Sequence, residues 1–228
     1  MILFLSYIPL YLLALLLWVL LRRRAYLVSP CFFAYAAFGV AASVARFVTH
    51  SYPRPYYATY WITEAIFCIL GVLAMYEVSR SSLGDLPRAW WVHLIFPFIL
   101  LSSVGLSLAR ANAGPPRVSG ILFWIVTAEI AVRLVQVSIF GGLATLVPLI
   151  GLRWRQYPFG VGMGFGLYAT VELLATARFA DLGAAFKVLW DVSSLTAYSV
   201  AVLIWIWFFW VPARITDPEL RALGPALR

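Results

Sequence analysis

The sequence predicts an all-α integral membrane protein, a bundle of seven transmembrane helices joined by short loops. Of the 228 residues, 64% are apolar and only 11% are charged, whereas a soluble domain carries about 25% charged residues. The apolar residues also gather in seven stretches, each close to the roughly 20 residues that a helix needs to cross a bilayer. These observations exclude a water-soluble globular enzyme and a disordered chain.

The seven stretches follow one another along residues 1–212. We expect the spans at residues 2–21, 27–48, 56–78, 89–109, 119–147, 159–177 and 184–211. The first stretch ends at Arg22-Arg23-Arg24 and lacks the basic start and the cleavage site of a signal peptide, so we expect a retained helix. Residues 213–228 form a short cytoplasmic tail, in which Thr216-Asp-Pro-Glu219 has the pattern of a helix-capping box.

The fifth stretch is longer than one span requires. From Ser119 to Leu152 it would measure about 51 Å as a continuous helix, against a hydrocarbon core of about 30 Å. It is nevertheless too short for two spans. We expect the helix to bend, break or leave the membrane at Gly141-Gly142 or at Pro148.

The basic residues predict the orientation. With the N-terminus outside, ten arginines fall on the cytoplasmic side, against five arginines and Lys187 on the outer side. Because cytoplasmic loops are enriched in Lys and Arg, we expect an outside N-terminus, a cytoplasmic C-terminus and a location in the plasma (inner) membrane. The net charge of +8 then reflects topology and not a nucleic-acid partner.

Aromatic residues are expected to lie at both membrane interfaces. Tyr52, Tyr56 and Tyr60 lie near the outer end of the third span, and the run Trp205–Trp210 lies at the inner end of the seventh. Tyrosine and tryptophan are enriched at these depths because their rings are apolar and their tips are polar.

Ionisable residues within the spans recur at helical spacing. Steps of three, four or seven residues place them in stripes on the third, fifth, sixth and seventh spans. The candidates are Glu64, Glu129, Arg133, Glu172, Lys187, Asp191 and Tyr198. Since charged side chains in hydrocarbon normally face the interior of a bundle, we expect the four stripes to meet in a polar pocket in the outer half of the membrane.

This pocket has two interpretations. In the first, it is a site for a ligand, an ion or a proton. In the second, Glu129–Arg133 and Lys187–Asp191 are ion pairs that hold the bundle together, and the other acids are protonated because an apolar medium disfavours the charged carboxylate. Glu64 and Glu172 are the stronger functional candidates, since neither has a partner within its own helix.

Four glycines alternate in the sixth span, at Gly160, Gly162, Gly164 and Gly166. No strand precedes them and no Gly-Lys-Ser/Thr follows, so they do not form a phosphate loop. The pairs 160/164 and 162/166 instead allow close approach of a neighbouring helix. That neighbour belongs either to this chain or to a partner.

The cysteines and histidines do not resemble a metal site. His50 and His93 fall on opposite sides of the membrane in the predicted topology, and no Cys/His spacing matches a zinc site. Cys31 and Cys68 are expected to be packing thiols. The sequence defines no cofactor, because a quinone, lipid or pigment held by apolar contacts leaves no motif.

Three classes of function remain. The sequence favours a non-catalytic accessory or structural subunit of a larger membrane complex, with a protein partner in the membrane. The alternatives are a sensor or receptor with a small ligand in the outer-half pocket, and a proton- or ion-coupled transporter or channel, against which the missing internal repeat counts. We do not expect an enzyme, because no nucleophile–base pair or metal-ligand set lies at matching depth.

Overall fold

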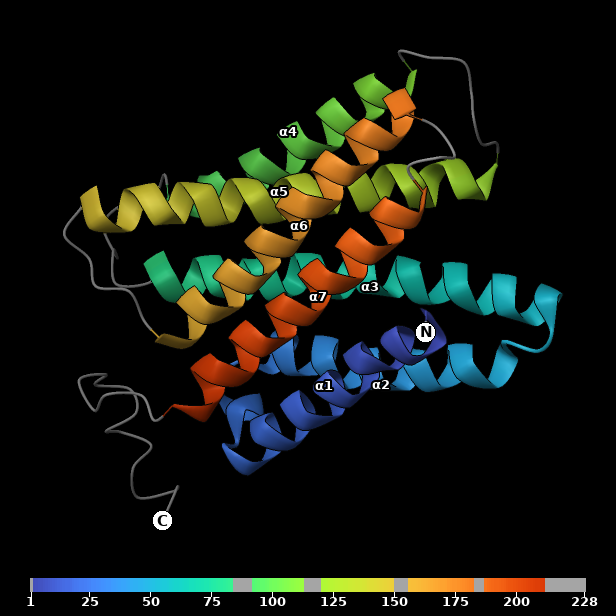
Figure 1. Ribbon diagram of the computed structural model, residues 1–228. Helices are drawn as coiled ribbons and strands as arrows, with labels where there is room; N and C mark the ends of the chain where they lie inside the picture. Colours follow the sequence, from blue (N-terminus) through green and yellow to red (C-terminus); the bar gives the residue numbers. More distant parts are fainter. Residues whose placement is uncertain (1, 84–91, 113–119, 150–155, 183–186, 212–228) are drawn as a thin grey trace.

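The computed structural model describes residues 2–83, 92–112, 120–149, 156–182 and 187–211 (Figure 1). Within these ranges the chain is helical and contains no strand. The helices are α1 (Ile2–Arg22), the short 3₁₀ helix η1 (Ala25–Leu27), α2 (Pro30–Thr49), α3 (Pro53–Leu83), α4 (Val92–Asn112), α5 (Ile121–Leu149), α6 (Gln156–Leu182) and α7 (Lys187–Trp210). The predicted tail and its capping box lie outside the described residues.

Helix length and composition indicate a membrane protein. Helices α2 to α7 each contain a stretch long and apolar enough to cross a membrane, and Ile8–Arg22 of α1 is a shorter apolar helix. Large apolar side chains such as Tyr11, Phe98 and Leu101 are exposed on the helix surfaces, as expected where lipid replaces water. The all-helical prediction is confirmed.

Helix α5 follows its prediction at one of the two expected positions. It continues without a break through the glycine pair at 141–142 but ends at Leu149, one residue after Pro148. Leu143 and Val147 are buried and hold the last turns of α5 in the core. Because Pro148 is the next-to-last residue of the helix, its missing N–H removes a hydrogen bond only at the helix end.

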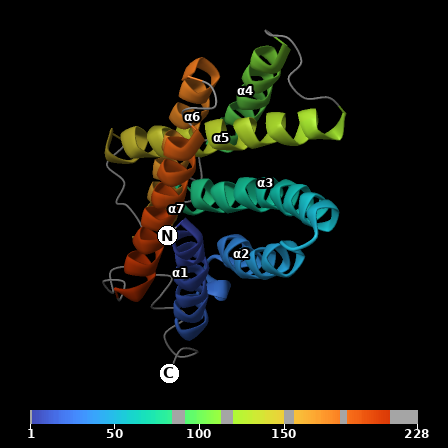
Figure 2. The same ribbon diagram turned by 45° about the vertical axis from the view of Figure 1, so that its right-hand side comes forward.

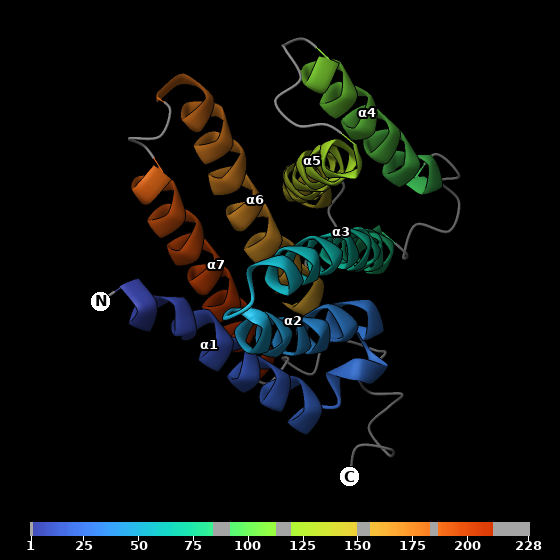
Figure 3. The same ribbon diagram turned by 90° about the vertical axis from the view of Figure 1, so that its right-hand side faces the viewer.

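Six helices form a closed ring, and α4 lies outside it. Around the ring, α1 contacts α2, followed by α3, α5, α6 and α7, and α7 contacts α1 again. Figures 2 and 3 show α4 on the outer side of α5. Ser103 and Ser107 of α4 are buried, and such small residues let two helices approach closely.

The two ends of the bundle differ. At the α2–α3 end, on the right in Figure 1, α2 ends and α3 begins, and α5 and α7 begin there too. The opposite end, which we call the α1–α2 end, has the ends of α1 and α7 and the start of α6. An aromatic core fills the ring toward the α1–α2 end.

This core is centred on Trp205 of α7, which is fully buried. Its ring lies 5.2 Å from that of Phe32 and 4.9 Å from that of Phe165, measured between centroids, and its Nε1 donates to the carbonyl of Val161 at 3.2 Å. Trp205 therefore faces the interior of the bundle and not the lipid. Helical periodicity turns it inward, whereas Trp207 is exposed.

The glycines of α6 pack against helices of this same chain. A Cβ atom at Gly160 or Gly164 would overlap the rings of Phe208 and Trp205 on α7, and one at Gly166 would lie 2.5 Å from the ring of Phe140 on α5. Helix α6 therefore lies in close contact with α5 on one face and with α7 on another. The sequence left open whether the neighbouring helix belongs to this chain or to a partner, and in this structure the neighbours are α5 and α7 of this chain.

Glu77, which the sequence did not single out, contacts the first turn of α2. Its Oε2 accepts a hydrogen bond from the backbone N–H of Cys31 at 2.6 Å, while Ser29, at the N-cap position of α2, makes no side-chain capping bond. The free N–H groups of a helix start favour an anion. Glu77 thus ties α3 to α2 at the α1–α2 end.

The C-terminal end of α7 is held by two other helices. Arg23 donates through Nη2 to the carbonyl of Trp210 at 2.6 Å. Gln156, the first residue of α6, donates through Nε2 to the carbonyls of Phe208 and Val211 at 3.0 and 2.9 Å. These donors satisfy carbonyls that a helix end leaves without partners.

Candidate functional site

A cavity of about 600 Å³ lies inside the ring, toward the α2–α3 end. All six ring helices contribute to its lining. Of the seven candidates named from the sequence, six line it: Glu64, Glu129, Arg133, Glu172, Asp191 and Tyr198. The side chain of Lys187 lies outside the described residues. The volume falls within the roughly 300–1,000 Å³ of small-molecule sites.

Helical spacing positions these side chains. On α3, Tyr60, Glu64 and Cys68 follow one another at steps of four, and on α6 Tyr168, Glu172 and Thr176 do the same. Residues four apart lie on one face of a helix. Each of these helices therefore turns a continuous polar and aromatic stripe toward the cavity.

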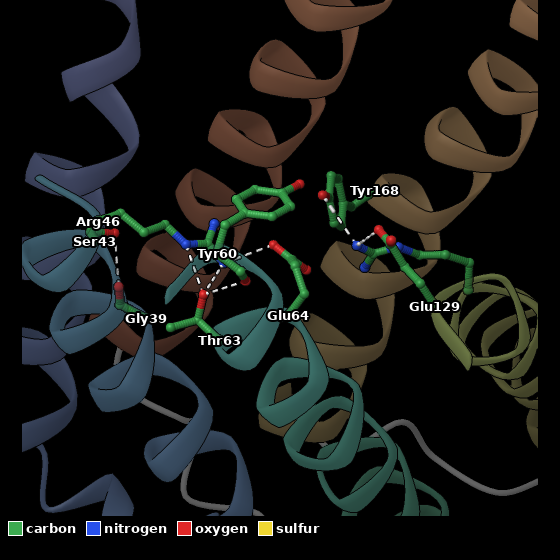
Figure 4. Close-up of polar contacts among 9 residues, drawn as sticks. Gly39, Ser43, Arg46, Tyr60, Thr63, Glu64, Glu129 and Tyr168 are labelled. Atoms are coloured by element: carbon green, nitrogen blue, oxygen red, sulfur yellow. Dashed lines mark hydrogen bonds and ion pairs between the residues drawn. The ribbon is translucent and has the colours of Figure 1, made fainter. Parts of the chain in front are cut away.

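One side of the cavity has an ion pair between α2 and α3 (Figure 4). Arg46 Nη2 lies 2.8 Å from Glu64 Oε1, with the two side chains 24% and 14% exposed. Arg46 also donates through Nε to the hydroxyl of Thr63 at 2.9 Å, and its guanidinium lies 4.6 Å from the ring centroid of Tyr60. Glu64 is thus paired, although not within its own helix.

Arg46 was missed as a site residue, because the sequence placed it at the outer edge among the basic residues that set topology. It belongs to the last turn of α2, so its side chain can reach across to α3. The signal available in the sequence was its position before the end of the apolar stretch, four residues ahead of His50.

The opposite side of the cavity has a second guanidinium, that of Arg133 on α5. Its Nη2 lies 3.5 Å from Glu129 Oε1 and 3.3 Å from the hydroxyl oxygen of Tyr168. Its Nη1 lies 3.5 Å from Gln136 Oε1, and its carbon Cζ lies 4.4 Å from the ring centroid of Tyr168. The expected pair within α5 is present, but its hydrogen bonds are long.

Two acids lining the cavity have no partner among the described residues. Glu172 is only 8% exposed and makes no hydrogen bond or ion pair with any described residue. Asp191 is likewise unpaired but exposed. The buried hydroxyl of Ser194, which also lines the cavity, has no hydrogen-bond partner there either.

The charges of this site interact with one another. Glu129 of α5 is close enough to Glu64 of α3 and Glu172 of α6 for their charges to act on it, together with that of Arg133. With Arg46 included, three carboxylates face two guanidinium groups. If all are charged, these five residues leave one negative charge unbalanced.

The cavity does not resemble a metal centre. Within the described part of the chain, no group of three or more His, Cys, Asp or Glu side chains could hold a metal ion. Cys68 lines the cavity as a free thiol, and Cys31 is also free. His50 packs against Tyr56 at 5.7 Å between ring centroids, and the side chain of His93 lies outside the description.

The fold and this site define a helical membrane protein with an internal polar cavity. Comparisons of the chain with known protein families, with curated proteins and with solved structures found no match. The residues of the site define the chemistry available to it. Among the described residues they offer two engaged cations, one buried acid without a partner and several aromatic rings.

Proposed function

We propose that this chain is a seven-span, non-catalytic membrane protein that binds a small ligand in the cavity, as a sensor or receptor. The seventh span is α1, whose 21 residues would measure about 31 Å and so match the hydrocarbon core. With the N-terminus outside, the cavity lies in the outer half of the membrane, where extracellular ligands can reach it.

The observation that carries this proposal is the buried acid Glu172, which has no partner among the described residues. Polar residues that only hold a bundle together are paired, because an isolated charge in a membrane is costly. Arg46 and Glu64 meet that expectation. Glu172 does not, although it is buried and lines a cavity large enough for a small molecule. A ligand that fills the cavity would supply the missing partner.

The other two functions have less support. The accessory-subunit function drew support from the lack of a catalytic motif, from the many aromatic residues and from the glycine face of α6, and this face packs against α5 and α7 of this chain. Its remaining support from the structure is the position of α4 outside the ring, with Phe98 and Leu101 exposed. The aromatic core around Trp205 fills the ring beyond the cavity, which argues against an open channel.

Native mass spectrometry of the tagged protein, extracted gently from its own membranes, tests this proposal. We expect a single chain that carries an additional small mass, which is released when the protein is denatured. The variant Glu172→Gln should express and fold normally but lose most of that mass. A bare chain would contradict ligand binding, and a stoichiometric protein partner without the added mass would favour the accessory subunit.

A further inference from the structure

We infer that the ligand is a small organic cation, an amine with a short apolar body, whose charge pairs with Glu172; this inference rests on the proposed function. The charge of the cavity and the engagement of its arginines select against an anion, and the lack of a metal-ligand group among the described residues selects against a metal ion. The aromatic walls suit an organic ammonium group.

The charge of the cavity favours a cation. Glu64, Glu129 and Glu172 come from three different helices and face only two guanidinium groups. A positively charged ligand would balance this excess, whereas an anion would increase it.

The arginines are not available to an anion. Arg46 is engaged by Thr63 and Glu64. The two terminal nitrogens of Arg133 lie 3.3–3.5 Å from acceptors of Glu129, Gln136 and Tyr168, and its Nε is buried, without a hydrogen-bond partner among the described residues. A carboxylate or phosphate ligand would therefore have to displace existing partners before it could bind.

A metal ion fits the cavity poorly. Divalent ions require several oxygen ligands within about 2.0–2.6 Å, and no group of three potential ligands is close enough for this in the described residues. The carboxylates instead surround a space of about 600 Å³. That space suits an organic molecule with a single charged group.

Two tyrosine rings in the wall of the cavity already contact the guanidinium groups of its arginines. Arg46 lies over Tyr60 at 4.6 Å and Arg133 lies over Tyr168 at 4.4 Å. Tyr168 lies one helical turn from Glu172 on α6, the ring of Tyr198 lies 5.2 Å from that of Tyr168, and Trp61 also lines the cavity. Aromatic rings beside a carboxylate are a typical environment for an organic ammonium group.

Matched probes of different charge test the inference on the purified full-length protein in detergent. Phenethylamine and hexylamine are the cationic probes, 2-phenylethanol and hexanol the neutral analogues, and phenylacetate and hexanoate the anionic analogues. Dissociation constants are measured by calorimetric titration. We expect the amines to bind and their analogues of equal carbon skeleton to bind at least about tenfold more weakly.

Substitutions then test whether the amine binds beside Glu172. Glu172→Gln should weaken amine binding by about thirtyfold or more, because a buried charge pair is lost, and Glu172→Asp should weaken it less. Glu77→Gln removes the same charge from a residue outside the cavity, and its affinity should equal that of the unmodified protein. Equal binding of all three probe classes, or full affinity in Glu172→Gln, would overturn the inference.

A cavity-filling variant separates this inference from the proposed function. Thr176→Phe adds bulk one helical turn from Glu172. If neutral or anionic probes bind the unmodified protein and lose affinity in Thr176→Phe, the cavity is a ligand site and only its cation preference is wrong. If no probe of any charge binds and the extracted protein carries no small mass, both proposals fail.

Discussion

At the scale of single residues, both arginines of the cavity are arranged in the same way. Each guanidinium faces a carboxylate and lies over a tyrosine ring: Arg46 with Glu64 and Tyr60, Arg133 with Glu129 and Tyr168. A ring and a carboxylate together replace the water that a charged group loses in a membrane. The hydrogen bonds of Arg46 are the shorter set, so its pair should stabilise the fold more.

A double-mutant cycle on Arg46 and Glu64 tests whether this ion pair stabilises the fold. Arg46→Gln should lower the free energy of unfolding by about 2 kcal/mol, because it leaves a largely buried carboxylate without its partner. The double variant Arg46→Gln/Glu64→Gln should recover part of the loss. Thermal unfolding in detergent measures both. A double variant less stable than either single variant would contradict the ion-pair explanation.

Helical spacing explains which site residues could be predicted. Glu129, Arg133 and Glu172 were found because steps of four residues define one face of a helix. Arg46 was missed because its partner belongs to the next helix, and spacing within one helix contains no information about contacts between helices. Glu77 was missed for the same reason, since its partner is a backbone N–H at the start of α2.

At the scale of helices, α6 depends on glycine for its place between two neighbours. Gly160 and Gly164 admit rings of α7, and Gly166 admits the ring of Phe140 on α5. Any side chain at these positions would displace a ring that is itself packed in the core. The same helix positions Glu172 in the cavity.

We therefore expect Gly164→Ala to lower the free energy of unfolding by about 2 kcal/mol, because the new methyl group overlaps the ring of Trp205. Gly141→Ala on α5 is the matched control, since nothing lies within 4 Å of a Cβ at that position. Its stability should be unchanged or slightly higher. Thermal unfolding compares the two variants, and equal losses would mean that the packing of α6 is not the cause.

The helices themselves could be predicted because hydropathy and length define a membrane helix almost without reference to its neighbours. The order of the helices around the ring could not, because lipid-facing and protein-facing surfaces are both apolar. Trp205 illustrates this limit. Its place in an aromatic run predicts an interface, and only its contacts with Phe32 and Phe165 reveal a core residue.

At the scale of the whole molecule, the two ends of the ring have different roles. The α2–α3 end contains the polar cavity, and the α1–α2 end is closed by aromatic packing and by the contacts of Arg23, Gln156 and Glu77 with helix ends. If the α2–α3 end faces outward, as the distribution of arginines predicts, the proposed ligand would enter from outside the cell.

Cysteine labelling tests this orientation in a background in which Cys31 and Cys68 are replaced by serine and alanine. Ser51→Cys, between α2 and α3, should react with a membrane-impermeant maleimide in intact spheroplasts. Leu27→Cys, in η1 at the other end, should react only after the membrane is permeabilised. The reverse pattern would show an inverted topology and would place the cavity on the cytoplasmic side.

Helix α6 also connects the cavity to the opposite end of the bundle. Glu172 and Gln156 are sixteen residues apart on one continuous helix, about 24 Å along its axis, and the amide of Gln156 is bonded to the last turn of α7. The glycine contacts pack α6 closely against α5 and α7. We therefore expect a displacement that a bound molecule imposes at Glu172 to be transmitted along α6 to the last turn of α7.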